Sequence, residues 1–387
     1  MGVIIGMDPH KRSATIEVID DRARVLAAGR YGTDKAGYAE MLKAGRKFED
    51  RVWAVEGCNG VGRHIAHRLV ASGETVLDVP AKLSAQVRVF ATGNGRKTDP
   101  VDAHSVALAA LRSAKLVQVV VSPDLVVLGM LADRRDELGR ARTQTINRIH
   151  RLLLELIPGG AKQFLSAAQA RALLATTRPR DIVGKTRRRL AAELITELDG
   201  IDRKIRACKK EITTLVQAQG STLLQLHGIG PSSAARLLAD VGNIHRFASR
   251  DHFASWNGTA PLDASSGQQL RHRLSRAGNR RINRALHIMA IVQLRNATEG
   301  RAYYDARKAA GKTSMEAMRC LKRRLSNVVY RQMLNDQDNR QVTGPGGHSG
   351  TTLKSSVTDL TPDIGSSDKP LPGPAAPQPR TPIRAAS

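Results

Sequence analysis

Four acidic residues near the N-terminus have the types and spacing of a metal-binding site. Asp8 ends one apolar, strand-like run and Glu56 ends another, whereas Asp99 and Asp102 lie three residues apart at the start of a helical segment. Residues three apart share one face of a helix. Four such carboxylates suit two Mg²⁺ ions about 3.5–4 Å apart, which stabilise the attacking and leaving oxygens of phosphoryl transfer. We therefore predict Asp8, Glu56, Asp99 and Asp102 as catalytic metal ligands.

Each of these acids also has a structural explanation. Asp8 precedes a proline and could open a turn, and Glu56 precedes a glycine and could be a solvated strand end. Asp99 could be the N-cap of a helix with a proline at its first position, and Asp102 would then lie beside the positive end of the helix dipole. The metal interpretation is favoured because all four acids occur together in this order.

A second segment could supply a nucleophile that attacks phosphorus. Residues 261–267 contain Ser265 and Ser266 followed by Gly267, and a basic stretch comes next. A serine beside a glycine is exposed in a loop, and nearby arginines could hold a phosphate and neutralise its charge. Serine attack gives a phosphoserine ester that conserves the bond energy, so that rejoining needs no cofactor. The alternative is an ordinary Ser–Gly turn before a basic helix.

The acids would be positioned by a mixed α/β domain, predicted over residues 1–118. Strands are predicted at residues 3–8, 14–20, 25–32, 52–56 and 75–79, and helices at residues 35–47, 61–72 and 100–114. A three-strand meander followed by alternating strands and helices predicts a mixed sheet with helices on its faces. With acids at these places, the pattern is that of an RNase H-like, RuvC-type nuclease fold.

Residues 119–220 are predicted to form a long helical arm. Apolar residues recur at spacings of three and four in two segments joined by residues 158–184, which indicates an antiparallel hairpin or an oligomerising coiled coil. Acidic residues do not balance the arginines along these segments, so we predict a nucleic-acid-binding surface there rather than a solvated helix face. The predicted contacts in the arm are Arg134, Arg135, Arg142, Arg187, Arg188 and Arg189.

Residues 221–335 are predicted to form a mostly helical domain that carries the serine segment. Gly228 and Gly230 precede a helical run, as in a helix-hairpin-helix that offers backbone N–H groups to a phosphate, and a tight turn between helices has the same pattern. Residues 336–387 are rich in proline, glycine and serine and are predicted to be a disordered tail. The other predicted nucleic-acid contacts are Arg96, Lys97, Arg271, Arg273, Arg276, Arg280 and Arg281.

The charge of the chain narrows the class of its partners. Its 387 residues include 61 Lys and Arg against 35 Asp and Glu, a formal net charge of +26, which favours nucleic acid over an anionic membrane surface. No run of about 18 apolar residues occurs, so no membrane span is predicted. No signal peptide is recognisable, and the three separated cysteines form neither a zinc nor a disulfide pattern, which fits a reducing cytoplasm.

Together these segments resemble the DEDD insertion-sequence transposases of the Piv/MooV group, also called the IS-one-ten family. The resemblance covers about residues 3–334, and the tail is not part of the pattern. It rests on residues 4–8, 55–57, 96–103, 228–230, 265–267 and 274–279. Within these, Lys-Thr-Asp-Pro-Val-Asp-Ala and Ser-Arg-Ala-Gly-Asn are specific when found together in this order.

The resemblance implies a RuvC-like domain, a coiled-coil middle and a C-terminal transposase domain with a catalytic serine. Carried over by position, that serine is Ser266, with Ser265 as the second choice, and the acids are the four named above. The family also implies a homo-oligomer, a dimer or tetramer, in which the acidic site of one subunit is completed by the serine of another. A structured bridge RNA that pairs with donor and target DNA is a further implied partner.

We therefore predict a DNA transposase that exchanges strands by Mg²⁺-dependent cleavage through a phosphoserine intermediate, guided by a bridge RNA, in the bacterial cytoplasm in association with the nucleoid. A first alternative is a RuvC-like junction resolvase that hydrolyses DNA with water and does not need Ser266. A second is a non-catalytic nucleic-acid-binding protein, which would bind without Mg²⁺-dependent cleavage. The presence of all four acids argues against the second.

Overall fold

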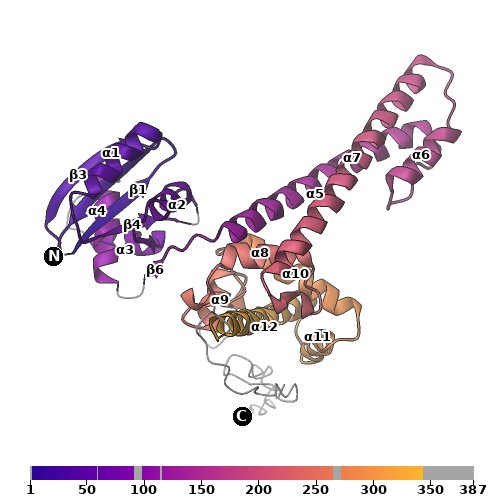
Figure 1. The fold of residues 1–387 in the computed structure, drawn as a ribbon. Helices are drawn as coiled ribbons and strands as arrows, with labels where there is room; N and C mark the ends of the chain where they lie inside the picture. Colours follow the sequence, from indigo (N-terminus) through magenta and orange to yellow (C-terminus); the bar gives the residue numbers. More distant parts are fainter. Residues whose placement is uncertain (1, 59, 91–97, 114–115, 265–271, 343–387) are drawn as a thin grey trace, which may run out of the picture. The chain divides into compact units, whose positions relative to one another are not determined.

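The computed structural model describes residues 2–58, 60–90, 98–113, 116–264 and 272–342 (Figure 1). The chain divides into two compact units, Met1–Pro123 and Asp124–Ser387. Each unit has its own hydrophobic core and is described by itself below.

The first unit contains a six-stranded mixed sheet in the order β3-β2-β1-β4-β5-β6. The strands are β1 (Val3–Pro9), β2 (Ser13–Ile19), β3 (Val25–Gly32), β4 (Arg51–Glu56), β5 (Val76–Val79) and β6 (Val117–Gln118). β1, β2 and β3 form an antiparallel meander, whereas β4 pairs in parallel with β1 and β5 in parallel with β4. The predicted mixed α/β class is confirmed, and the short antiparallel strand β6 was not predicted.

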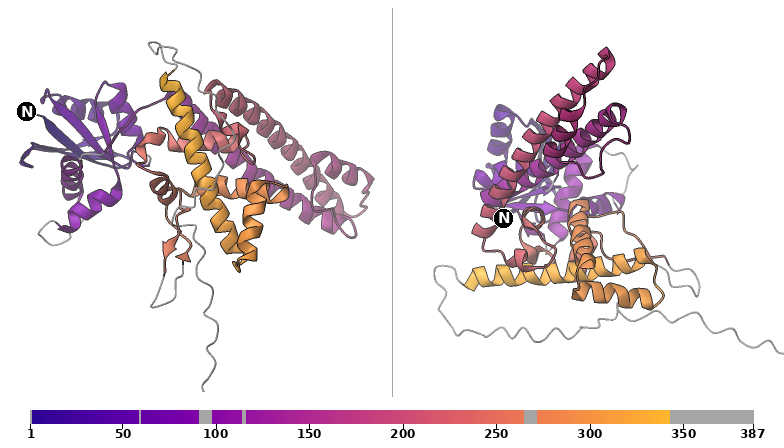
Figure 2. Two further views of the ribbon diagram at one scale, coloured as in Figure 1. Left: turned by 90° about the horizontal axis from the view of Figure 1, so that it is seen from below. Right: turned by 90° about the vertical axis from the view of Figure 1, so that its right-hand side faces the viewer.

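Helices cover both faces of this sheet. They are α1 (Lys35–Gly45), α2 (Arg63–Ala71), α3 (Ala81–Phe90) and α4 (Asp99–Arg112). Because side chains alternate along a strand, Ile5 and Met7 of β1 pack with α1 and α2, whereas Ile4 packs with α3 and α4. Figure 2 shows the sheet between these helices. Residues of β1 and β4 that lie on the same side of the sheet as Ile4 therefore face α4.

Gly6 permits an unusually close approach of α4 to β1. A Cβ atom at Gly6 would lie 2.4 Å from the carbonyl oxygen of Ala103 and 2.6 Å from Cβ of Ala107. Only glycine, which lacks a Cβ, allows backbones to approach this closely. This contact brings the first turn of α4 next to the end of β1, where Asp8 lies.

The second unit begins with two long helices, α5 (Pro123–Leu156, 34 residues) and α7 (Ile182–Ala218, 37 residues), in the places predicted for the arm. At one end they pack with the short helix α6 (Ala167–Thr176), around Ile149, Leu153 and Ile195. The two long helices lie where the sequence predicted them. Whether they form a coiled coil stays a prediction.

The other end of the arm belongs to the core of the C-terminal helices. These are α8 (Pro231–Val241), α9 (Arg250–Trp256), α10 (Arg280–Arg295), α11 (Glu299–Ala309) and α12 (Ser314–Val342), with the 3-10 turns η1 (Thr222–Gln225) and η2 (Ile244–Arg246). Leu128 of α5 and Ile212 of α7 are buried in one cluster with Leu237 and Leu286. One core therefore spans the predicted boundary at residue 220.

The predicted start of the disordered tail at residue 336 is wrong for the next seven residues, because α12 continues to Val342. The Asp336 carboxylate is buried and accepts hydrogen bonds from the Ser221 hydroxyl and the Thr222 backbone N–H, each at 2.9 Å. Composition changes near this point, but side-chain packing keeps the helix in place. Residues 343–387 lie outside the described residues.

Candidate functional site

Strand alternation and the α4 contact bring three of the four predicted acids to one place. Asp8 lies two residues after Gly6 on β1, and Glu56 lies two residues after Ala54 on β4. Because side chains alternate along a strand, both acids point to the face that α4 covers. Asp102 lies in the first turn of α4 and is 5% exposed. The side chains come from two parallel strands and one helix, as the sequence predicted.

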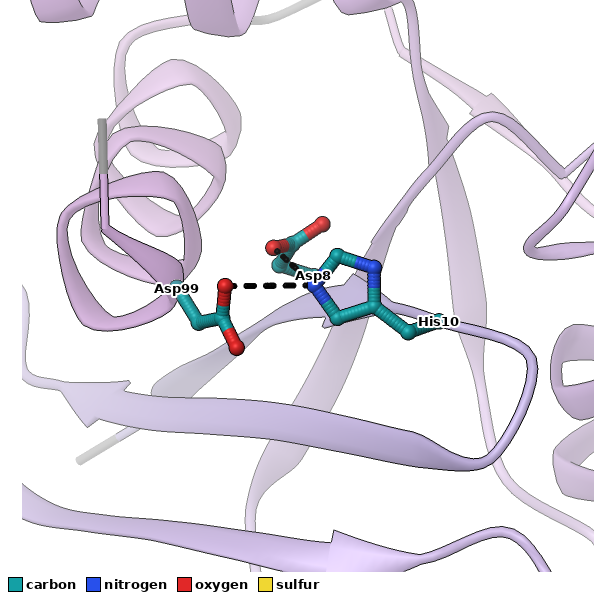
Figure 3. Close-up of side chains that lie close together, drawn as sticks. All are labelled: Asp8, His10 and Asp99. Carbon is teal, nitrogen blue, oxygen red and sulfur yellow. Dashed lines mark ion pairs between the residues drawn. The ribbon is translucent and has the colours of Figure 1, made fainter.

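Asp99 completes the group from the start of the same helix. The structure does not support the structural alternative in which Asp99 is the N-cap, because Thr98 is the N-cap residue of α4 and its side chain makes no capping hydrogen bond. Asp99 is instead the first helical residue, with Pro100 following it in the first turn. Its carboxylate points toward the side chain of His10 (Figure 3).

His10 lies between Asp8 and Asp99 and was not predicted. Its Nε2 atom is 3.3 Å from Asp8 Oδ2 and 3.3 Å from Asp99 Oδ1 (Figure 3). One ligand atom from each of these three residues lies within 4.8 Å of the others, a separation that a single metal ion could bridge. The sequence signal that could have predicted His10 as a site residue is its position only two residues after Asp8.

The electrostatics show that three neighbouring carboxylates act on Asp8. Burial raises the pKa of Asp8 above its ordinary value, and the charges of Asp102, Glu56 and Asp99 raise it further, whereas His10 opposes the shift. Carboxylates repel when they share a site, so the three neighbours disfavour the ionised form of Asp8. The acids therefore form one electrostatic cluster, which a cation would stabilise.

Three further side chains hold the acids in place, and none was predicted. Arg30 of β3 pairs with Asp99, with 3.1 Å between its NH1 atom and Asp99 Oδ2, and Arg88 of α3 pairs with Asp102. The hydroxyl of Ser84 donates to Glu56 Oε2 at 2.9 Å. These partners come from elements far apart in sequence, so only the folded sheet brings them to the acids.

The donor set fits a hard divalent cation. Carboxylate oxygens are the ligands that Mg²⁺ prefers. Two guanidinium groups, those of Arg30 and Arg88, already pair with carboxylates of the cluster, so positive charge is favoured at this position. Binding of an ion would compete with these groups for the same oxygens.

The predicted nucleophiles Ser265 and Ser266 lie outside the described residues. The strands β7 (Leu262–Asp263) and β8 (His272–Arg273), which flank the serine segment, pair in an antiparallel arrangement. The segment that precedes β7 and the segment that follows β8 contact each other through their backbones. Gly278 has φ +84°, and a Cβ atom added to it would lie 2.5 Å from the Trp256 carbonyl oxygen. The Ala-Gly-Asn part of the motif thus joins the two flanks of the serine segment.

These flanks are anchored to α10 and α12. The Asn283 side-chain amide donates to the carbonyl oxygens of Asn257 and Gly258 at 3.0 Å, and Lys322 Nζ donates to Asn283 Oδ1 at 2.6 Å. Burial, with a smaller contribution from the charge of Arg280, lowers the pKa of Lys322 to about 8. Lys322 was not predicted, because nothing in its sequence context distinguishes it from a surface lysine.

The expectation that acidic residues do not balance the arm arginines is wrong for four of them. Arg134 pairs with Glu137, Arg142 with Asp202, Arg187 with Glu155 and Arg189 with Glu193. Arg188 Nε donates to the carbonyl oxygen of Thr177 at 3.0 Å. Asp202 and Glu155 lie on the long helix opposite to the arginine that each one pairs with, so the charge balance could not be predicted from either segment alone. Arg135 has no ion pair within the described residues.

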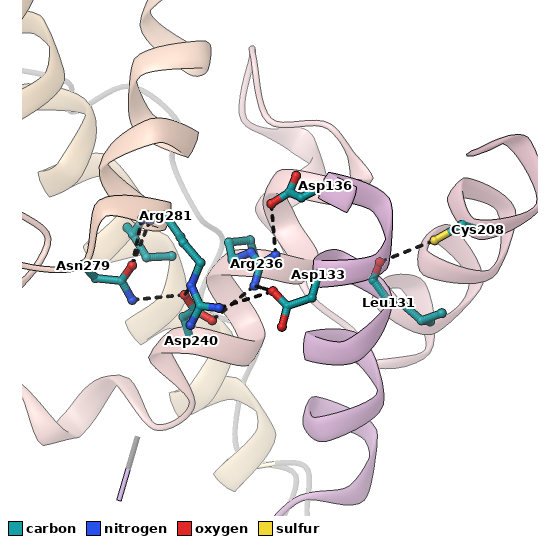
Figure 4. Close-up of polar contacts among 9 residues, drawn as sticks. Leu131, Asp133, Asp136, Cys208, Arg236, Asp240, Asn279 and Arg281 are labelled. Carbon is teal, nitrogen blue, oxygen red and sulfur yellow. Dashed lines mark hydrogen bonds and ion pairs between the residues drawn. The ribbon is translucent and has the colours of Figure 1, made fainter. Parts of the chain in front are cut away.

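Of the predicted C-terminal contacts, Arg281 belongs to a polar network that ties α5 to α8 and α10 (Figure 4). Its NH1 atom is 3.3 Å from Asp133 Oδ1, and its Nε atom is 3.1 Å from Asp240 Oδ2. Arg236, whose side chain is 6% exposed, contacts the same two acids and Asp136. The network joins the arm to the C-terminal helices.

The remaining predicted contacts have different environments. Arg280 donates to the Ser275 carbonyl oxygen at 3.3 Å, and Arg273 and Arg276 are exposed. Gly228 has φ +93°, and its Cβ would lie 2.9 Å from the Met289 carbonyl oxygen, so packing against α10 accounts for this glycine. Gly230 is the N-cap residue of α8. Arg96, Lys97 and Arg271 lie outside the described residues.

Two parts of the chain match known protein families. Residues 220–305 match the family described as transposase IS116/IS110/IS902, and residues 5–158 match a family described as transposase, of the DEDD IS110 type. The second match contains all four acids of the cluster. The first contains the serine segment and the motif that follows it.

Proteins of similar sequence come from insertion elements. The chain is 27% identical to the insertion element IS900 uncharacterized 42 kDa protein of Mycobacterium paratuberculosis, over 86% of this chain and 95% of that protein. It is 28% identical to the transposase for insertion sequence element IS1111A of Coxiella burnetii, over 69% of this chain and 70% of that protein.

Among solved structures, the chain is similar to T. thermophilus RuvC in complex with a Holliday junction substrate. The match has 18% identity and a TM-score of 0.26, and it covers 31% of this chain and 100% of that chain. A similarity at this TM-score supports no conclusion by itself. In the described part of the chain, no helix combines the length and apolar character that crossing a membrane needs.

Proposed function

Because the chain belongs to the transposase family of IS116, IS110 and IS902, an enzyme family that cuts and joins DNA, we propose that it exchanges DNA strands through a covalent serine intermediate. The observation that carries this proposal is the cluster of Asp8, Asp99 and their neighbouring carboxylates at the end of β1. Strand exchange needs positive charge at the reacting phosphate, which metal ions held by such a cluster would supply.

In the proposed step the Ser266 hydroxyl oxygen bonds to a phosphorus of the DNA backbone. The bond from that phosphorus to the 3′ oxygen breaks, the serine proton is released, and the 3′ oxygen takes up a proton and leaves as a hydroxyl. The 5′ phosphate stays on the serine. Attack by a 3′ hydroxyl of another strand reverses the step and frees Ser266, so that the number of phosphoester bonds is unchanged.

The carboxylates Asp8, Glu56, Asp99 and Asp102 are proposed to hold Mg²⁺, in one or two ions. When bound, Mg²⁺ neutralises phosphate charge and lowers the pKa of a nearby hydroxyl. The chain itself positions the ligands, because Ser84 orients Glu56 and strand pairing fixes Asp8. Release of Arg88 and Arg30 from the acids would leave two guanidinium groups beside the site, where they can bind the phosphate.

The partners are proposed to be donor and target DNA, a bridge RNA and further copies of the chain. The net charge of +26 supports a polyanionic partner. The acids lie in the first unit and the serine segment in the second, which is compatible with a site completed by another subunit. The bridge RNA rests on the resemblance to the family alone.

Detection of a covalent protein–DNA adduct tests the proposal. The purified protein, its RNA and a labelled element-end duplex are incubated with Mg²⁺, and the product is separated under denaturing conditions. We expect an adduct with the intact protein, and none with Ser266→Ala, with Asp102→Asn or after addition of EDTA. Ser265→Ala is the matched control and should keep the adduct.

The other outcomes assign the function differently. Mg²⁺-dependent cleavage that survives Ser266→Ala would indicate hydrolysis by water, as in a junction resolvase. Binding without cleavage by the intact protein would indicate a non-catalytic nucleic-acid-binding protein.

A further inference from the structure

We propose that one face of α7 is a binding site for nucleic-acid phosphates, separate from the arm arginines predicted from sequence. This α7 basic face consists of Arg203, Arg206, Lys209, Lys210 and Thr213. The inference rests on the proposed function only in that the chain acts on nucleic acid. It does not depend on the catalytic step.

The spacing of these residues puts them on one exposed stripe of the helix. Arg203, Arg206 and Lys210 recur at intervals of three and four residues, which is the period of a helix face. All three side chains are exposed, whereas Cys208, Ile212 and Val216 on the opposite side of α7 are buried in the core. The packing therefore fixes which side of α7 faces solvent.

A shallow hollow of about 340 Å³ lies on this face. It is lined by Arg206, Lys209, Lys210, Thr213 and Thr214. The threonine hydroxyls donate to the carbonyl oxygens of Lys209 and Lys210 within the helix, at 2.7 Å and 3.2 Å. Three cationic side chains and two threonines thus lie around the hollow, and cationic side chains can bind a phosphate group.

The acids that could neutralise this face are used elsewhere. Asp199 and Asp202 lie four residues before Arg203 and Arg206, the spacing of a favourable helix ion pair. Asp199 instead pairs with Arg171 of α6, and Asp202 pairs with Arg142 of α5 at 2.6 Å. Within the described part of the chain neither arginine forms an ion pair with these acids. The hydrogen bond from Arg171 is the main cause that lowers the pKa of Asp199, and the charges of Arg203 and Arg206 contribute to the same shift.

The lysines of the face also lack acidic partners on the helix. Four residues before and after Lys209 are Ile205 and Thr213, and at the same distances from Lys210 are Arg206 and Thr214. Within the described part of the chain, no ion pair involves either lysine. Glu211 follows Lys210 directly and lies about 100° around the helix from it.

The same helix provides an internal comparison. Near its start, Arg187 and Arg189 are paired with Glu155 and Glu193, and Arg188 is bonded to a backbone carbonyl. A phosphate that binds there must first displace these partners, whereas no ion pair among the described residues involves the cationic side chains of the α7 basic face. Phosphate contacts of this kind are independent of base sequence and release counterions, so they weaken as salt increases.

The test compares two triple variants of the full-length protein that remove equal charge from α7. One is R206Q/K209Q/K210Q, and the matched control is R187Q/R188Q/R189Q. Both are made in the Asp102→Asn background, so that binding is measured without cleavage. Affinity for a random-sequence DNA duplex and for a random-sequence RNA hairpin is measured by fluorescence anisotropy over a range of salt concentrations, and folding is checked by circular dichroism and thermal melting.

We expect R206Q/K209Q/K210Q to weaken binding and to reduce the slope of log affinity against log salt by about 2–3, because about one slope unit is lost per phosphate contact. The control should change the slope by less than half as much. Loss confined to the duplex or to the hairpin identifies which nucleic acid binds there.

Equal losses of affinity and of salt dependence in the two variants would overturn the proposal, since only net charge would then matter. An unchanged slope of log affinity against log salt in R206Q/K209Q/K210Q would also overturn it. The background protein binding neither probe would overturn it as well. Failure of the catalytic proposal appears separately, as a missing covalent adduct with the unmutated protein, and leaves these binding results interpretable.

Discussion

Asp8 carries an energetic cost in the folded protein when no cation is bound. Burial and the neighbouring carboxylates raise its pKa, so its ionised form is less stable in the folded state than in the unfolded state. This loss of folding stability is absent below the pKa that Asp8 has in the unfolded state. It appears as the pH rises toward the higher pKa of the folded state and is complete above that pKa. Asp8→Asn cannot ionise, so we expect it to raise the Tm of the metal-free protein at neutral pH by a few degrees at most.

Thermal melting in EDTA and in excess Mg²⁺ measures this effect apart from activity. Ligands that bind only the folded state raise the Tm, so Mg²⁺ should stabilise the unaltered protein more than Asp8→Asn. The advantage of Asp8→Asn in EDTA should shrink on acidification. The exposed residue Asp21 supplies a control, Asp21→Asn, which should show neither behaviour. A lower Tm for Asp8→Asn in EDTA at neutral pH would mean that the contact with His10 outweighs the repulsion.

At the scale of elements, the end of α12 is a structural part of the C-terminal helices. Asp336 accepts two hydrogen bonds of 2.9 Å and is 6% exposed, and Gln337 Oε1 accepts from the Ile244 backbone N–H at 2.9 Å. A chain that ends at residue 335 leaves the backbone N–H groups of Thr222 and Ile244 without these acceptors. We expect this truncation to lower the free energy of unfolding by about 2–4 kcal/mol, since each lost buried partner costs about 1–3 kcal/mol.

Truncation after Val342 is the matched comparison, and it should leave urea unfolding unchanged because α12 stays complete. Asp336→Ala in the full-length chain should reproduce most of the loss caused by ending the chain at residue 335. Equal stability of the two truncated proteins would show that the contacts of Asp336 and Gln337 contribute little.

At the scale of the whole molecule, the acids and the serine segment belong to different compact units joined near Pro123. We predict that Ser266 of one protomer works with the acids of another. Mixing Ser266→Ala with Asp102→Asn should then restore some covalent adduct, because one mixed site contains both functional residues. Each variant alone supplies the control. Heterodimers that form no adduct would contradict a shared site and leave the serine step untouched.

Much of the first unit follows from sequence because short apolar runs bounded by polar and turn residues predict buried strands. The runs that contain Asp8 and Glu56 are almost continuously apolar and stop at these acids, and the strands end within one residue of the predicted places. The spacing of Asp99 and Asp102 likewise predicts one helix face. The chemical types of the site, and the family, were therefore readable from the chain alone.

Only the tertiary structure decided what surrounds those acids and which charges remain unpaired. His10, Arg30 and Arg88 reach the carboxylates because the residues after β1, strand β3 and helix α3 all come next to the first turn of α4 in the packed unit. The register of α5 against α7 pairs Arg142 with Asp202 and Arg187 with Glu155, so these two arginines are neutralised, whereas no ion pair among the described residues involves the cations of the α7 basic face. Ion pairs depend on distances of a few ångströms between segments far apart in sequence. Local periodicity contains no information about such distances, whereas packing determines them.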